Sequence, residues 1–341
     1  MPENGSRSDR DLILAELREA EKLICVTHEN PDGDAVGSLI AMQQLLTGLG
    51  KSSVMFLDRS ELPLPQEYRF LPLDGVVHEP PEDLESRTIV FLDCGNLERN
   101  PAAALQRPSP PAHLHILNID HHHDNTRFGT VNLVDDTASC TAEIVWDLMH
   151  GLGVPPTPVI ASALYVGLIT DTGRFMYENT GPRAHIMAAE LIEAGVDVHD
   201  IYRHVYEDIP YGKLALLARG LANVRRYDEG RLTVTELSVE DYVSTGAEES
   251  YSEGVIDHLR AVAGTAVAAL VRDRIGDEPA GPGLPQQRKV SLRASDDRVD
   301  VSAIARAQGG GGHRQAAGFS TTLDTDALVA FLREQVALQL A

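Results

Sequence analysis

The sequence has few cysteines and no long apolar segment. Its three cysteines, Cys25, Cys94 and Cys140, are an odd number and lie far apart, which argues against a disulfide framework. We expect them to be buried, reduced thiols. No apolar run approaches the ~20 residues that a membrane-spanning helix needs, and the polar N-terminus lacks the apolar core of a secretion signal. These absences predict a cytoplasmic protein.

Basic residues are also scarce. The 29 lysines and arginines stand against 51 aspartates and glutamates, which gives a formal net charge of −22 at pH 7. Proteins bind long nucleic acids largely by neutralising phosphates with Lys and Arg, so this balance argues against a long duplex as a partner. Short nucleotides and cations remain compatible with the charge.

The pattern of apolar residues predicts two domains. At 341 residues the chain is long enough for two hydrophobic cores. In its first part, apolar runs typical of buried strands alternate with amphipathic segments typical of helices, which predicts an α/β domain with a mainly parallel sheet flanked by helices. The expected strands are residues 23–26, 53–57, 88–92 and 115–119. We expect this domain to cover residues 1–196, a helical linker to cover 197–226, and a smaller α/β domain to cover 227–341.

Polar side chains collect where the predicted strands end. The segments "HENPDGD" at 28–34, "FLDCGN" at 91–96 and "NIDHHHDN" at 118–125 each end or follow an apolar run, and "LITDTGRF" at 168–175 ends a predicted helix. In open α/β sheets, ligands bind beyond the carboxyl ends of the strands. One such motif alone is more often a turn or a helix cap, but four of them in order predict one shared site.

The residue types in these motifs favour metal ions as ligands. Asp and His side chains without cysteine suit Mn²⁺ or Mg²⁺ better than structural zinc. Four of the carboxylates would repel one another strongly if they were ionised at close range: Asp32, Asp34, Asp93 and Asp171. Two divalent cations would cancel that repulsion, so the charge favours two metal ions over one.

With these residues, the chain resembles a DHH-family phosphoesterase, most closely the nanoRNase/pAp phosphatase subgroup. The residues that carry the resemblance are the H-x-N-P-D-G-D run from His28 to Asp34, then Asp93, the signature Asp120-His121-His122, and Asp171-Thr172-Gly173. The segment "GGGGHRQAAGF" at 309–319 resembles the signature of the DHHA1 domain that accompanies this catalytic domain. The resemblance covers nearly the whole chain.

The resemblance implies two bound cations, most readily Mn²⁺, with Mg²⁺ or Co²⁺ as alternatives. Asp93 would bridge them and take part in catalysis. Asp120 would support the two histidines that follow it, and His122 would face the substrate phosphate. The extra histidine, His123, is a neighbour and not a ligand. The other ligands would divide between the cations: His28 and Asp32 for the first, and Asp34, His121 and Asp171 for the second.

The second domain is expected to bind part of the substrate. Backbone N–H groups of glycines approach an anion without obstruction from a Cβ atom, and an arginine offers a planar fork of donors. Arg293 ends an expected strand over residues 289–293. We prefer Arg293 over Arg314 because the resemblance implies an arginine at the end of this strand. The expected substrate-binding residues are Arg293, Gly310, Gly311, Gly312 and His313.

Together these features predict a hydrolase that acts on phosphoric esters. By the resemblance, it cleaves very short oligoribonucleotides to mononucleotides and 3′-phosphoadenosine 5′-phosphate (pAp) to AMP and phosphate, with water that two metal ions activate. A phosphodiesterase for cyclic dinucleotides is the alternative in the same reaction class. A catalytically inactive, nucleotide-binding regulator is the alternative in another class, although every expected metal position is filled here. A homodimer is compatible with the sequence.

Overall fold

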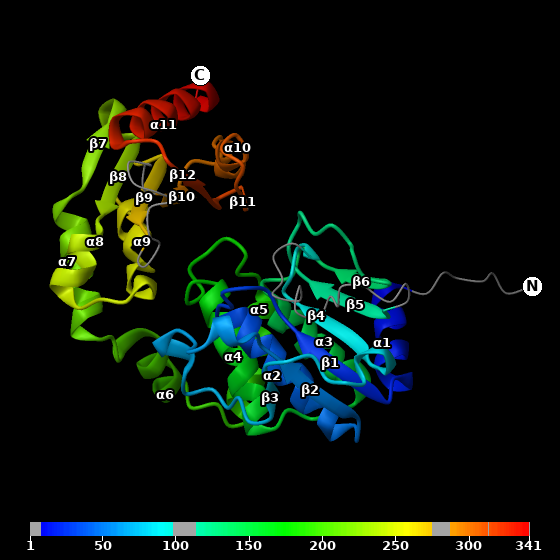
Figure 1. The fold of residues 1–341 in the computed structure, drawn as a ribbon. Helices are drawn as coiled ribbons and strands as arrows, with labels where there is room; N and C mark the ends of the chain where they lie inside the picture. The colour runs from blue at the N-terminus through cyan, green and yellow to red at the C-terminus, as the bar shows by residue number, and fades with distance from the viewer. Residues whose placement is uncertain (1–7, 98–113, 275–286, 313, 341) are drawn as a thin grey trace, which may run out of the picture. The chain divides into compact units, whose positions relative to one another are not determined.

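The chain folds around two separate six-stranded sheets, each with its own hydrophobic core (Figure 1). The computed structural model describes residues 8–97, 114–274, 287–312 and 314–340. The sheets belong to two compact units, residues 1–208 and 209–341. Within the described ranges, no helix is both long enough and apolar enough to span a membrane.

The sheet of the first unit has only parallel pairs among its described strands. In the order β3-β2-β1-β4-β5-β6, the chain runs outward from β1 on one side and from β4 on the other. These two central strands therefore flank a topological switch point, where the carboxyl ends of the strands open a crevice. The strands are β1 Lys22–Val26, β2 Ser52–Phe56, β3 Val76–Val77, β4 Thr88–Leu92, β5 Ile116–Asp120 and β6 Val131–Val134.

The parallel sheet and four of its strands confirm the prediction from the sequence. The other two strands, β3 and β6, were not predicted. The β3 strand has two residues, and all four residues of β6 are only partly buried. Neither strand carries the fully buried apolar run that identifies β1 and β4.

The described α-helices of the first unit pack on one face of its sheet. Their buried side chains share a core with alternate strand residues such as Cys25 and Val90. The intervening strand residues, such as Ile24 and Ile89, form a smaller cluster on the opposite face. The helices are α1 Asp9–Glu19, α2 Gly33–Gly48, α3 Thr141–Leu152, α4 Pro158–Asp171, α5 Pro182–Glu193 and α6 Val198–Tyr202, which a π-helix over Arg203–Glu207 continues.

The α2 and α4 helices pack very close together because glycines face the contact. A Cβ atom on Gly37 would lie 2.3 Å from a backbone carbonyl oxygen of α4, and one on Gly33 would lie 2.4 Å from a threonine hydroxyl of α4. The contact places the first turn of α2 against the last turn of α4. Asp34 and Asp171, which lie at these two helix ends, thereby become neighbours.

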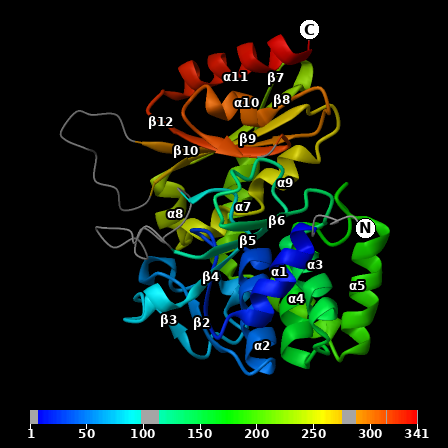
Figure 2. The same cartoon turned by 90° about the vertical axis from the view of Figure 1, so that its right-hand side faces the viewer.

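The second unit has a mixed sheet in the order β11-β12-β10-β9-β8-β7. Among its described strands, β8 and β9 pair in parallel and the other neighbours are antiparallel. Helices α7, α8 and α9 pack on one face, and α10 and α11 cover the other (Figure 2). The strands are β7 Arg225–Tyr227, β8 Leu232–Leu237, β9 Val267–Asp273, β10 Arg288–Ala294, β11 Gly311–Gly312 and β12 Ala316–Thr321. The helices are α7 Tyr211–Ala222, α8 Val239–Thr245, α9 Val255–Arg260, α10 Val301–Arg306 and α11 Thr325–Leu340.

The segment predicted as a helical linker, 197–226, is divided between the two units. Its first part forms α6 and the π-helix in the first unit, and α7 belongs to the second unit. Its last two residues, Arg225 and Arg226, lie in β7, which pairs with β8. A three-residue edge strand with exposed arginines has no buried face, so the apolar pattern does not reveal it.

Replacing Gly37 by alanine tests the close contact between α2 and α4. The added Cβ atom has no room, so the α4 backbone must shift, and we expect the free energy of unfolding to fall by about 1–3 kcal/mol. The matched control is Gly48→Ala in the same helix, where the new Cβ would lie 3.7 Å from the nearest side-chain atom. We expect that control to gain about 0.4–1 kcal/mol. Equilibrium unfolding in urea measures both changes, and equal effects would contradict the packing described.

Candidate metal centre

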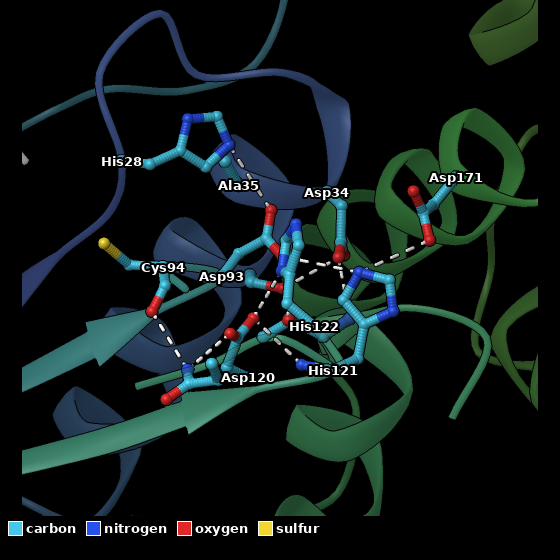
Figure 3. A network of polar contacts seen from close by, with 12 residues as sticks. His28, Asp34, Ala35, Asp93, Cys94, Asp120, His121, His122 and Asp171 are labelled. Atoms are coloured by element: carbon cyan, nitrogen blue, oxygen red, sulfur yellow. Dashed lines mark hydrogen bonds and ion pairs between the residues drawn. The ribbon is translucent and has the colours of Figure 1, made fainter. Parts of the chain in front are cut away.

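The predicted metal ligands and catalytic residues gather at the carboxyl edge of the first sheet, at the switch point between β1 and β4 (Figure 3). His28 follows β1, Asp93 follows β4, and Asp120 is the last residue of β5. Asp171 comes from a different direction, as the last residue of α4. Asp93 has a φ of 57°, in the left-handed region that is uncommon for residues with a side chain. Its backbone turns sharply there, directly after β4.

Asp93 lies at the centre of the site and is only 2% exposed. Its Oδ2 is 3.5 Å from Nε2 of His28, and its Oδ1 is 3.6 Å from Nε2 of His121. The Nδ1 atom of His28 lies 2.7 Å from the backbone carbonyl oxygen of Glu29. Because a carbonyl oxygen only accepts, Nδ1 is the donor in this hydrogen bond, and Nε2 is the ring nitrogen that faces Asp93. Nδ1 of His122 also lies 3.5 Å from Oδ1 of Asp93. The two oxygens of this carboxylate therefore face imidazoles of different predicted ligand sets, an arrangement that suits a ligand shared between two cations.

Three groups of side chains bring their ligand atoms within 4.8 Å of one another. Two of them correspond to the predicted ligand sets: His28, Asp32 and Asp93, and Asp34, His121 and Asp171. Asp93 adjoins the second group through its contact with His121. The third group consists of Asp93, His121 and His122, and it was not predicted from the sequence. It places His122 beside the predicted ligands.

Buried negative charge dominates the electrostatics of this site. Burial, followed by the charges of Asp93 and Asp171, raises the pKa of Asp34 well above its ordinary value. Burial, with Asp32 and Asp93 as neighbours, raises the pKa of Asp171 in the same way. Burial also raises the pKa of Asp93, but the hydrogen bond with His28 and the nearby imidazole charges outweigh burial and lower that pKa overall. Carboxylates that repel one another at close range fit divalent cations, which would relieve the repulsion.

Asp120 contacts both histidines that follow it and has no exposed surface. Its Oδ1 accepts the backbone N–H of His121 at 2.9 Å and lies 2.7 Å from Nδ1 of His122. Asn125 donates its side-chain amide to the other carboxylate oxygen. These are the contacts that a carboxylate would make if it oriented the two histidines. They also leave Nε2 of His122 directed away from Asp120.

Further groups, which the sequence pattern does not reveal, contact the predicted ligands. The first two backbone N–H groups of α3 donate to the carboxylate of Asp34, at 2.7 and 2.9 Å. The side-chain amide of Asn179 donates to the backbone carbonyl oxygen of Asp171 at 3.2 Å. The run "SCTAE" at 139–143, with a glutamate in the first turn of the following helix, is a helix-start signal that could have drawn attention to α3. No local pattern marks Asn179.

The predicted substrate-binding residues belong to the second unit. Arg293 lies in β10, where its Nη1 donates to a backbone carbonyl oxygen of the same strand. Gly311 and Gly312 form β11, which pairs with β12. A Cβ atom on Gly310 would lie 2.2 Å from a backbone oxygen of β12. Close packing is therefore a sufficient reason for glycine at this position. His313 lies outside the described residues, and substrate binding by this set stays a prediction.

The fold and the site define a class: a two-domain α/β protein with carboxylates and imidazoles gathered at the edge of a parallel sheet. Residues 22–168 match the N-terminal domain of the DHH family, and residues 232–338 match the DHHA1 domain. The chain belongs to the DHH family, which confirms the resemblance drawn from its motifs.

Three proteins illustrate what the chain is similar to. The bifunctional oligoribonuclease and PAP phosphatase NrnA of Thermus thermophilus is 34% identical over 309 residues, which are 90% of this chain and 86% of that protein. An exopolyphosphatase-related protein from Bacteroides fragilis has a TM-score of 0.83 at 22% identity, over 99% of this chain and 98% of that one. RecJ from Thermus thermophilus in complex with Mn²⁺ has a TM-score of 0.56 at 17% identity, over 98% of this chain and 55% of that one. These two structures share the fold.

Asparagine in place of Asp171 tests the repulsion between the clustered carboxylates, of which Asp171 is partly exposed and Asp34 and Asp93 are buried. Because folding raises the pKa of Asp171, its charged form destabilises the folded state at neutral pH, and the destabilisation disappears as the pH falls to the ordinary pKa of an aspartate. We expect metal-free Asp171→Asn protein to melt about 2–4 °C above the parent at neutral pH, and the gain to vanish in acid. A lower melting temperature at neutral pH would contradict the repulsion.

Added Mn²⁺ should reverse the order of the two melting temperatures. A cation at 100 times its dissociation constant stabilises the parent by about 2.7 kcal/mol, and the variant has lost one of the predicted ligands. Asp124→Asn is the control, because Asp124 is an exposed carboxylate of the neighbouring loop. We expect this control to melt like the parent with and without the metal ion.

Proposed function

We propose that this protein is a metal-dependent phosphoesterase that hydrolyses very short oligoribonucleotides to mononucleotides and pAp to AMP and phosphate. The observation that carries the proposal is Asp93, whose two carboxylate oxygens face histidines of two different ligand sets. Support for the substrates comes from the Thermus thermophilus relative, a bifunctional oligoribonuclease and PAP phosphatase that is similar over 90% of this chain.

Two divalent cations, preferably Mn²⁺, are the proposed cofactors, and Mg²⁺ or Co²⁺ would substitute. His28 and Asp32 would hold the first cation, and Asp34, His121 and Asp171 would hold the second. Asp93 would be shared between these two ligand sets. Oxygen and nitrogen donors without sulfur suit these ions, and the raised pKa values of Asp34 and Asp171 fit a site that needs positive charge. When bound, the cations would lower the pKa of water and neutralise charge on the phosphoryl oxygens.

His122 would act on the substrate in this proposal. Its Nδ1 lies against Asp120, so Nε2 is the nitrogen that would contact a phosphoryl oxygen or give a proton to the leaving oxygen. Asp120 would fix the orientation of the ring and increase its basicity. The His122 side chain is 11% exposed, which fits a group that a substrate atom must reach.

The second unit would bind a part of the substrate away from the scissile bond. Arg293 would pair with a phosphate through its planar guanidinium group, as arginines do in bidentate contacts. The backbone N–H groups of Gly311 and Gly312, with His313, would supply further donors to the same anion. The N–H of Gly310 already donates to the backbone carbonyl oxygen of Ala305, so Gly310 would contribute through the close approach of its backbone. A phosphate-bearing end held in this way would favour short substrates over internal sites in a long strand.

A panel of substrates tests the proposed function. With Mn²⁺ present, we expect release of mononucleotides from a diribonucleotide and of phosphate from pAp. A chelator should abolish both activities, and excess Mn²⁺ should restore them. Preferred cleavage of a cyclic dinucleotide would instead support the alternative phosphodiesterase. Absence of hydrolysis with metal ion bound would support the inactive regulator.

Replacing His122 by alanine tests its role directly. Loss of a proton donor and phosphoryl contact should lower kcat by about 100-fold or more, while calorimetry should still detect Mn²⁺ binding as in the parent. His123→Ala is the matched control, because His123 is exposed and adjacent in the chain. Loss of Mn²⁺ binding together with turnover would make His122 a metal ligand, as its group with Asp93 and His121 allows.

A further inference from the structure

Thr141 makes contacts with two of the predicted metal ligands at once. It is the first residue of α3 and has no exposed surface. Its hydroxyl donates to Oδ1 of Asp93 at 3.0 Å, and its backbone N–H donates to Oδ2 of Asp34 at 2.7 Å. A single buried residue therefore connects the proposed bridging carboxylate to a carboxylate of the second ligand set.

The hydroxyl of Thr141 is not needed to start the helix. Cys140 is the N-cap residue of α3 and makes no capping hydrogen bond through its side chain. The carboxylate of Asp34 accepts the first two backbone N–H groups of α3 instead, from Thr141 and Ala142. The Thr141 hydroxyl donates its hydrogen bond to Asp93 and not to the helix backbone. This contact points to a function for the hydroxyl in orienting the Asp93 carboxylate.

Asp93 needs such a restraint to serve two cations. The torsion that turns a carboxylate about its last carbon–carbon bond is soft, so the side chain by itself does not hold its two oxygens in a fixed direction. Here Oδ2 faces His28 and Oδ1 faces His121, on opposite sides of the carboxylate. Rotation away from this orientation would break the hydrogen bond to Oδ1 that Thr141 donates.

We propose that Thr141 is a positioning residue that holds Asp93 in the orientation in which one carboxylate can serve both cation sites. This inference rests on the metal centre of the proposed function. Thr141 would touch neither cation nor substrate, and it would act through Asp93 and through its link to Asp34. Groups that orient a ligand in this way typically contribute about 10–100-fold to metal affinity.

Isosteric substitution separates the hydroxyl from the methyl group. In Thr141→Val the hydroxyl is lost and the shape is kept, whereas Thr141→Ser keeps the hydroxyl. Thr235→Val is the control for the loss of a buried hydroxyl elsewhere, because Thr235 donates to a backbone carbonyl oxygen in the second unit. Mn²⁺ titration by calorimetry gives the affinities, and electron paramagnetic resonance shows whether two Mn²⁺ ions share a bridge, since bridged ions have coupled spins.

We expect the parent, Thr141→Ser and Thr235→Val to bind two Mn²⁺ ions with a spin-coupled signal. Thr141→Val should bind the second ion about 10–100-fold more weakly and show uncoupled Mn²⁺ at the same concentration. Parent-like affinity and coupling in Thr141→Val would overturn the inference and leave the metal centre intact. Weak binding in Thr141→Ser as well would also overturn it, because packing of the methyl group would then be the cause. A parent that binds no Mn²⁺ would overturn the metal centre itself.

Discussion

Negative charge buried at one point of the first sheet is the constraint on which the rest of the site depends. Asp34, Asp93 and Asp171 come from three distant segments, and burial together with their mutual repulsion raises the pKa of two of them. The surrounding groups donate hydrogen bonds to these carboxylates. The donors are backbone N–H groups of α3, the Thr141 hydroxyl and the Asn179 amide. A core selected for stability alone would avoid such a cluster, so its presence points to a ligand that brings positive charge.

The fold concentrates this charge through two features of the first unit. Strand order places β1 and β4 next to each other, so the segments that follow them leave the sheet at the same point. Glycines at positions 33 and 37 let α2 approach α4 closely enough to bring Asp34 beside Asp171. The site therefore depends on backbone packing that contains no functional side chain.

The second unit shows how context changes the meaning of a motif. Four consecutive glycines, from Gly309 to Gly312, would by themselves indicate a flexible linker. In the structure, Gly311 and Gly312 pair with β12, and Gly310 lies so close to that strand that a side chain would not fit. These glycines are part of a sheet within a DHHA1 domain. The backbone N–H of Gly310 donates to the carbonyl oxygen of Ala305, so this part of the run is fixed by hydrogen bonding as well as by packing.

The sequence by itself predicted a mainly parallel sheet, because buried apolar runs alternate with helical segments. It also identified residues that meet at the edge of the sheet, because His28, Asp93 and Asp120 each lie at or just after the end of a buried apolar run. It did not reveal β7, whose exposed arginines carry no pattern, or the hydrogen bonds that Asn179 and Thr141 donate to the site. Thr141 is 48 residues from Asp93 along the chain. Periodicity describes one element at a time, whereas such a hydrogen bond exists only after separate elements have packed, so the tertiary structure alone decided it.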